Sequence, residues 1–224
     1  MTLAVGDILK NGVLFDMKNW DGSAAHADAL PAAVEQLFVL LDERQIDYLL
    51  VGGVALLSYI DGRNTQDVDF ILARPALNEL PELVITEENR DFARAVFNRL
   101  QVDVLLAENP LFESVLEDYA TQQQFGDRTI RCATVEGLVL LKLFALPSLY
   151  RQGQFDKVSI YEGDITLLLL RHPVDTAALL RVLERYVLAT DLREIEQILR
   201  DIQGRIERFQ PQRDRFGGGQ SEET

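Results

Sequence analysis

Two aspartates separated by a single residue stand at the start of an apolar run. Residues 66–72 read QDVDFIL, so Asp67 and Asp69 alternate with Val68 and Phe70. This alternation predicts a β-strand on which the two carboxylates point the same way. Two like charges so close repel each other, and a fold seldom keeps them unless a cation or a proton lies between them. A divalent metal is the natural occupant, so the pair predicts a metal site. A solvated strand edge, which acids protect against aggregation, is the simpler alternative.

A third aspartate occupies the middle of a second apolar run. Residues 100–106 read LQVDVLL, which predicts a strand with Asp103 at its centre. If this strand neighbours the first, at about 4.8 Å, Asp103 completes a triad. Three carboxylates without histidine form an all-oxygen ligand set, which suits Mg²⁺ or Mn²⁺ and not zinc or copper. Such a site supports phosphoryl-type transfer, in which divalent ions activate a hydroxyl and stabilise a pyrophosphate leaving group.

A glycine pair precedes the aspartates. The apolar run of residues 48–51 predicts a buried strand, Gly52 and Gly53 stop it, and helix-compatible residues 54–59 follow. A backbone without Cβ can approach a triphosphate, and the N–H groups that open the following helix favour negative charge. The glycine pair therefore predicts a phosphate-binding turn.

Polar residues beside the strands offer further contacts. Arg63 and Thr65 can orient the loop before the first aspartate, touch phosphate or cap the turn, and the sequence leaves all three roles open. Arg94 and Arg99 lie just before the third aspartate. A solvated arginine is the expectation for each, with a triphosphate contact as the alternative.

Taken together, the GG turn, R-x-T-x-D-h-D on one strand and h-D-h on another (h is apolar) resemble the nucleotidyltransferase superfamily with the polymerase-beta-like palm. Within it, the chain resembles the bacterial abortive-infection, type IV toxin-like group, whose K-L-x-A-like motif matches LKLFA at 141–145. A second motif of that group, a lysine and acid before a final helix, matches residues 157–167 with Asp164. The resemblance spans residues 46–170. It implies that Asp67, Asp69 and Asp103 hold the metal and carry catalysis, and that Gly52, Gly53, Arg63, Thr65 and Lys142 bind the nucleotide.

The implied fold is of the α+β class, with a nucleotidyltransferase-type mixed β-sheet flanked by helices and a mostly helical C-terminal region. We expect a catalytic core at 1–130 that includes an N-terminal helix at 24–44, a helical region at 131–215 and a disordered tail at 216–224. Residues 110–124 predict a helix and 129–132 a strand. Breaks at 172–173 and near 190–191 divide the C-terminal helices.

Composition narrows the class of protein. With 36 acidic against 22 basic residues, the net charge of −14 argues against general nucleic-acid coating, although a tRNA end needs only a local basic patch. The single cysteine, Cys132, allows no internal disulfide and favours a cytoplasmic location. No run approaches the roughly 20 apolar residues of a membrane span. Two histidines and no P-loop disfavour Ser-His-Asp hydrolases, kinases and dinucleotide-binding enzymes.

Three functions share this sequence pattern. The first is a nucleotidyltransferase that moves a nucleoside monophosphate from NTP to a hydroxyl of tRNA or other RNA, of a protein or of a small molecule. The second is a toxin of a toxin–antitoxin or phage-defence pair, held in check by an antitoxin-like protein partner. The third is a catalytically inactive nucleotide-binding or scaffolding protein of the same fold.

Overall fold

The structure is a computed structural model that describes residues 29–60, 65, 67–125 and 128–217. The chain divides into two compact units, Met1–Leu138 and Val139–Thr224. The boundary falls inside helix α7 (Val135–Arg151), which begins in the first unit and continues in the second. The first unit contains the β-sheet, and the described part of the second unit is helical.

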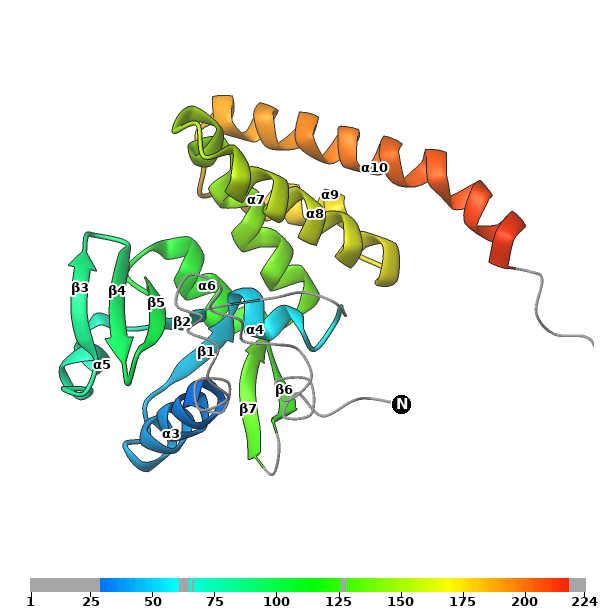
Figure 1. Ribbon diagram of the computed structural model, residues 1–224. Coiled ribbons are helices and arrows are strands. Elements are labelled where there is room, and N and C mark those ends of the chain that lie inside the picture. Colours follow the sequence, from blue (N-terminus) through cyan, green and yellow to red (C-terminus); the bar gives the residue numbers. More distant parts are fainter. Residues whose placement is uncertain (1–28, 61–64, 66, 126–127, 218–224) are drawn as a thin grey trace, which may run out of the picture. The chain divides into compact units, whose positions relative to one another are not determined.

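Within the described residues, the first unit forms one seven-stranded mixed sheet in the order β3-β4-β5-β2-β1-β7-β6 (Figure 1). The central strand β2 pairs antiparallel with β1 and parallel with β5, which confirms the predicted mixed sheet. The strands are β1 (Tyr48–Val51), β2 (Asp67–Leu72), β3 (Val84–Glu88), β4 (Phe92–Phe97), β5 (Leu100–Leu106), β6 (Ala120–Phe125) and β7 (Arg128–Ala133).

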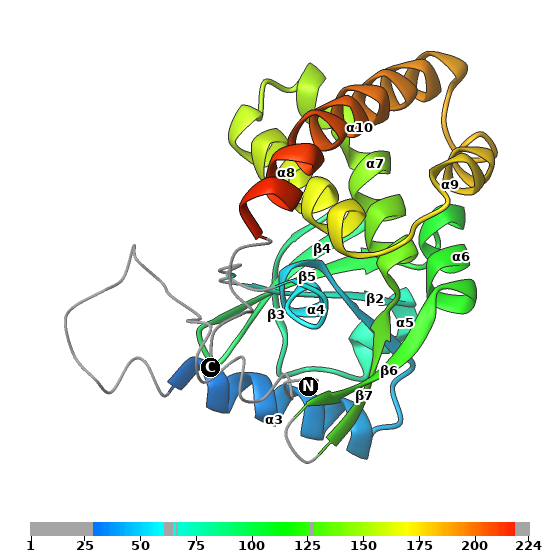
Figure 2. The same cartoon turned by 90° about the vertical axis from the view of Figure 1, so that its right-hand side faces the viewer.

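Helix α3 (Ala29–Glu43) covers one face of this sheet (Figure 2). The Phe38 ring lies 6.0 Å from the ring of Tyr48 and 5.9 Å from that of Phe70, measured between centroids. Side chains alternate between the faces of a strand. Because Phe70 faces α3, its neighbour Asp69 and the next alternate residue, Asp67, point to the opposite face.

Short helices connect the strands, and they include one correction to the sequence-based expectation. They are α4 (Gly52–Leu56), α5 (Arg74–Asn78) and α6 (Pro110–Asp118). The helix predicted over 110–124 is wrong beyond Asp118, because residues 120–125 form strand β6. This strand reads ATQQQF and lacks an apolar alternation, so its conformation depends on antiparallel pairing with β7.

The described part of the second unit consists of α7 from Val139 onward, α8 (Phe155–Arg171), α9 (Thr176–Leu183) and α10 (Ala189–Gly217), which confirms the predicted helical C-terminal region. Buried Ile165 and Leu168 on α8, and Ile195 and Leu199 on α10, follow helical spacing and form apolar stripes. Figure 1 shows α10 running beside α8.

Some sequence-based expectations fall on residues that the structure leaves undescribed. Residues 24–28 of the expected N-terminal helix and residues 218–224 of the expected tail lie outside the described residues. Helix α10 itself continues to Gly217, so the first two residues assigned to the tail are helical. Among the described helices, none combines the length and apolarity needed to cross a membrane.

Candidate functional site

The pairing of β2 with β5 brings the three aspartates together. The two strands run parallel, with Asp69 opposite Asp103, so the side chains of these two residues lie on the same face. Asp67 lies on that face as well, two positions before Asp69. One carboxylate oxygen from each of the three aspartates lies within 4.8 Å of the other two. Asp103 is buried, whereas Asp67 and Asp69 are half-buried.

The glycine pair that follows β1 contacts the carboxylate of Asp69 through its backbone. The Gly53 N–H donates a hydrogen bond to Asp69 Oδ2 at 3.3 Å. Gly52 has a φ of +64°, and a Cβ at this position would lie 1.9 Å from the same carboxylate oxygen. A side chain on Gly53 would collide with Thr65, whose Oγ1 would lie 2.3 Å away. The sequence assigned these glycines to a triphosphate, and the structure gives them a contact with a candidate metal ligand.

Thr65 orients the first aspartate of the triad. Its buried hydroxyl lies 3.0 Å from Asp67 Oδ1 and 3.1 Å from the Asp67 carbonyl oxygen, so it can donate to either acceptor. Among the roles left open by the sequence, this geometry favours orientation of the loop that leads into β2. Arg63, the other predicted residue of this loop, lies outside the described residues.

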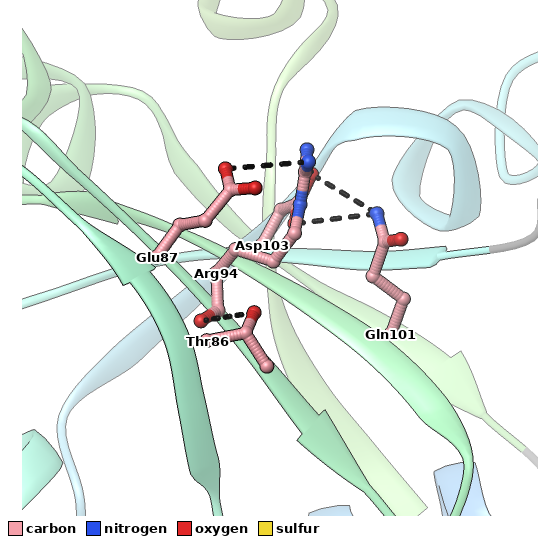
Figure 3. Close-up of polar contacts among 5 residues, drawn as sticks. All are labelled: Thr86, Glu87, Arg94, Gln101 and Asp103. Carbon is pink, nitrogen blue, oxygen red and sulfur yellow. Dashed lines mark hydrogen bonds and ion pairs between the residues drawn. The ribbon is translucent and has the colours of Figure 1, made fainter.

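Asp103 is held by an arginine from the neighbouring strand β4 (Figure 3). Arg94 Nε donates to Asp103 Oδ1 at 2.8 Å and Arg94 Nη2 donates to Asp103 Oδ2 at 3.0 Å. Hydrogen bonding to Asp103 is the largest cause that raises the pKa of Arg94 above its ordinary value, and the charges of Asp103, Glu87 and Asp67 add to it. The expectation of a solvated arginine is wrong for Arg94, whose guanidinium makes a two-bond contact with a triad residue.

The predicted nucleotide-binding lysine lies in the second unit. Lys142 on α7 is buried, and its Nζ forms an ion pair with Asp164 Oδ2 on α8 at 2.9 Å. The same ammonium lies 4.2 Å from the centroid of the Tyr161 ring, a cation–π contact. The two motifs matched at Lys142 and Asp164 therefore meet in one ion pair. A role of Lys142 in nucleotide binding stays a prediction.

The triad fits a divalent cation by its chemistry. Its donors are carboxylate oxygens, the ligands that Mg²⁺ and Mn²⁺ prefer. Two oxygens bound to one Mg²⁺ lie at most about 4.2 Å apart, so oxygens within 4.8 Å of one another need only a small side-chain adjustment. Thr65 and Gly53 each contact one carboxylate of the triad and restrict its orientation.

Comparison with solved structures identifies the fold. The crystal structure of an antigenic nucleotidyltransferase-like protein from Paracoccidioides brasiliensis is similar, with a TM-score of 0.52 and 16% identity over 81% of this chain and 93% of that protein. The antibiotic-resistance factor ANT(2'')-Ia is similar in its solution structure, with TM-score 0.48, 15% identity, and 79% and 94% of the two chains covered. The crystal structure of ANT(2'')-Ia with adenylyl-2''-tobramycin has a TM-score of 0.44 and 15% identity, over 62% of this chain and 94% of that chain. No protein-family model matches the chain, and no curated protein matches it by sequence. The first of these likenesses confirms the predicted nucleotidyltransferase-type fold.

Proposed function

We propose that this protein is a nucleotidyltransferase that depends on a divalent metal and transfers a nucleoside monophosphate from an NTP to a hydroxyl group of an acceptor. The observation that carries the proposal is the juxtaposition of Asp67, Asp69 and Asp103 on paired strands. A fold by itself hosts many functions, so the carboxylate triad, and not the likeness of fold, supports the activity.

In this scheme Asp67, Asp69 and Asp103 would hold Mg²⁺ or Mn²⁺. When bound there, the metal would lower the pKa of the attacking hydroxyl and neutralise charge on the pyrophosphate leaving group. Asp103 helps to take the proton from the acceptor hydroxyl. The acceptor oxygen then forms a bond to the α-phosphorus, the bond between that phosphorus and the bridging oxygen to the β-phosphate breaks, and pyrophosphate leaves. Thr65 and the Gly53 N–H keep two of the carboxylates in place throughout.

The resemblance extends the proposal to binding residues and partners. Arg63 and Lys142 are assigned to the nucleotide, and the acceptor class is RNA such as tRNA, a protein or a small molecule. The toxin role with an antitoxin-like partner stays a prediction of the sequence. Growth arrest on expression of the wild type, and normal growth on expression of Asp69→Asn, is its test.

Nucleotide binding tests the proposed function without knowledge of the acceptor. We would measure the thermal unfolding midpoint with each of the four NTPs, with and without Mg²⁺. A ligand at a hundredfold excess over its Kd stabilises the folded state by about 2.7 kcal/mol. For a chain of this length that corresponds to a midpoint increase of roughly 5–11 °C. We expect such an increase for at least one NTP, in the presence of Mg²⁺ only.

Two variants make the test specific to the triad. The Asp67→Asn/Asp69→Asn variant removes two negative charges at the proposed metal site, so its Mg²⁺-dependent midpoint increase should disappear. Asp118→Asn changes an exposed acid on α6 of the same unit and should retain it. A midpoint that no NTP changes in the wild type, or an increase that survives in the double variant, would refute the proposed function.

A further inference from the structure

Arg94 places a permanent positive charge inside the candidate metal site. In the antiparallel pair of β4 and β5, Arg94 lies opposite Asp103. Its Nε–H and Nη2–H groups donate hydrogen bonds to the two carboxylate oxygens of Asp103 (Figure 3). The Asp103 side chain is 11% exposed and that of Arg94 is 31% exposed. The contact therefore lies at the boundary between the sheet and solvent, where a side chain can change partner without unfolding the strand.

Both carboxylate oxygens of Asp103 accept contacts from neighbouring side chains. Its Oδ1 accepts from Arg94 Nε at 2.8 Å and from Gln101 Nε2 at 3.3 Å. Its Oδ2 accepts from Arg94 Nη2 at 3.0 Å and from Gln101 Nε2 at 3.4 Å. The two short bonds come from Arg94, whereas both contacts from Gln101 come from one nitrogen at longer distance and are weaker. Arg94 therefore occupies one acceptor site on each oxygen of Asp103, and its positive charge repels a divalent cation that approaches this carboxylate.

A second acid lies within reach of the arginine. Glu87 on β3 is the register partner of Arg94, and its Oε2 lies 3.7 Å from Arg94 Nη1. The Glu87 side chain is 68% exposed, so it can follow the guanidinium without steric hindrance. Arg94 thus lies between the carboxylate of Asp103, which belongs to the triad, and that of Glu87, which does not.

We propose that Arg94 is a built-in counter-ion that competes with the divalent metal for Asp103, and that Glu87 receives the guanidinium when the metal binds. This inference deepens the proposed function and rests on it. In the metal-free protein, Arg94 neutralises part of the repulsion among the three aspartates. When the metal binds, one or both of the Arg94–Asp103 hydrogen bonds break, and the pair with Glu87 shortens.

Metal affinity, measured without nucleotide, tests this competition. We would titrate each variant with Mn²⁺ and follow free Mn²⁺ by electron paramagnetic resonance. Removing one positive charge close to a divalent cation should lower the Mn²⁺ Kd of Arg94→Gln by roughly tenfold. Arg94→Lys keeps the charge and should keep a Kd close to that of the wild type. Glu87→Gln removes the alternative partner and should raise the Kd by roughly threefold.

Two controls separate this inference from the function on which it rests. Arg44→Gln removes the same charge from an ion pair with Glu82, away from the triad residues, and should leave the Kd unchanged. The Asp67→Asn/Asp69→Asn variant should lose Mn²⁺ binding. Mn²⁺ binding that depends on these aspartates but is unchanged or weaker in Arg94→Gln would overturn the inference alone, because Arg94 would then only support Asp103. No binding by any variant, or binding independent of the aspartates, would overturn the inference and the proposed function together.

Discussion

The effect of the substitution Gly52→Ala on stability tests the close contact between the glycine turn and the Asp69 carboxylate. Gly52 adopts a φ of +64°, in the left-handed region that glycine adopts without steric cost. A Cβ at this position would lie 1.9 Å from Asp69 Oδ2, 2.3 Å from its Cγ and 2.6 Å from its Cβ. All three atoms belong to the short side chain of Asp69 on the central strand β2. The Asp69 carboxylate must therefore shift from its position to admit the new methyl group.

The expected cost has two sources. Placing alanine in the left-handed region costs about 1–2 kcal/mol. To reach an ordinary contact of roughly 3.5 Å, the Asp69 oxygen must move by about 1.6 Å, which breaks its hydrogen bond with the Gly53 N–H. A hydrogen bond to a charged group contributes about 1.5–3 kcal/mol. We therefore expect Gly52→Ala to lower the free energy of unfolding by about 2.5–5 kcal/mol.

A double-mutant cycle followed by urea denaturation separates the two sources. In an Asp69→Gly background the colliding atoms are gone, so Gly52→Ala should cost only the backbone part, about 1–2 kcal/mol. Gly153→Ala provides a reference for that part, because Gly153 has a φ of +67° and its Cβ would meet only Phe155 Cε2 at 3.9 Å.

The result that refutes this reasoning is a cost of Gly52→Ala that is the same in both backgrounds. The close approach of the glycine turn to Asp69 would then be absent in solution. A cost in the wild-type background no larger than that of Gly153→Ala would lead to the same conclusion.

Two further predictions concern buried polar groups. Burial raises the pKa of Cys132 to about 12, so at about pH 8 roughly one thiol in ten thousand is ionised, and an aromatic disulfide reagent should modify the protein only after denaturation. Rapid modification of the native protein would show that this part of the sheet is open to solvent. Lys142→Met leaves Asp164 buried without its cationic partner and should cost about 3–5 kcal/mol in urea denaturation, whereas Lys142→Met/Asp164→Leu should recover most of it. Equal costs for the single and double variants would contradict the ion pair.

Sequence patterns predicted the strands that carry the aspartates because the local signal there is strong. The alternation at 66–72 and the apolar run at 100–106 correspond to β2 and β5. The strand predicted at 129–132 also appears, as β7. Local pattern alone does not give the register that sets Asp69 opposite Asp103, since it depends on pairing between distant segments.

The contact between Arg94 and Asp103 was missed for an identifiable reason. No strand was predicted for residues 92–97, which form β4 in a hairpin with β5. The two residues between these strands, Asn98 and Arg99, have φ values of +46° and +72°. Hairpin turns of this kind usually carry glycine as the second residue, and arginine there hides the turn from sequence inspection. The alternation in FARAVF is the signal that could have revealed β4.

We expect the hairpin of β4 and β5 to form before β5 pairs with β2. Arg94 and Asp103 lie 9 positions apart in one hairpin, whereas Asp69 and Asp103 lie 34 positions apart and meet only through parallel pairing. Local hairpins close faster than distant strands dock. We therefore expect Asp103 to be paired with Arg94 before β5 docks against β2, so that the arginine reduces the repulsion among the three aspartates as the strands meet. The arginine that we propose as a competitor of the metal in the folded protein would thus also help the nascent chain to assemble the site.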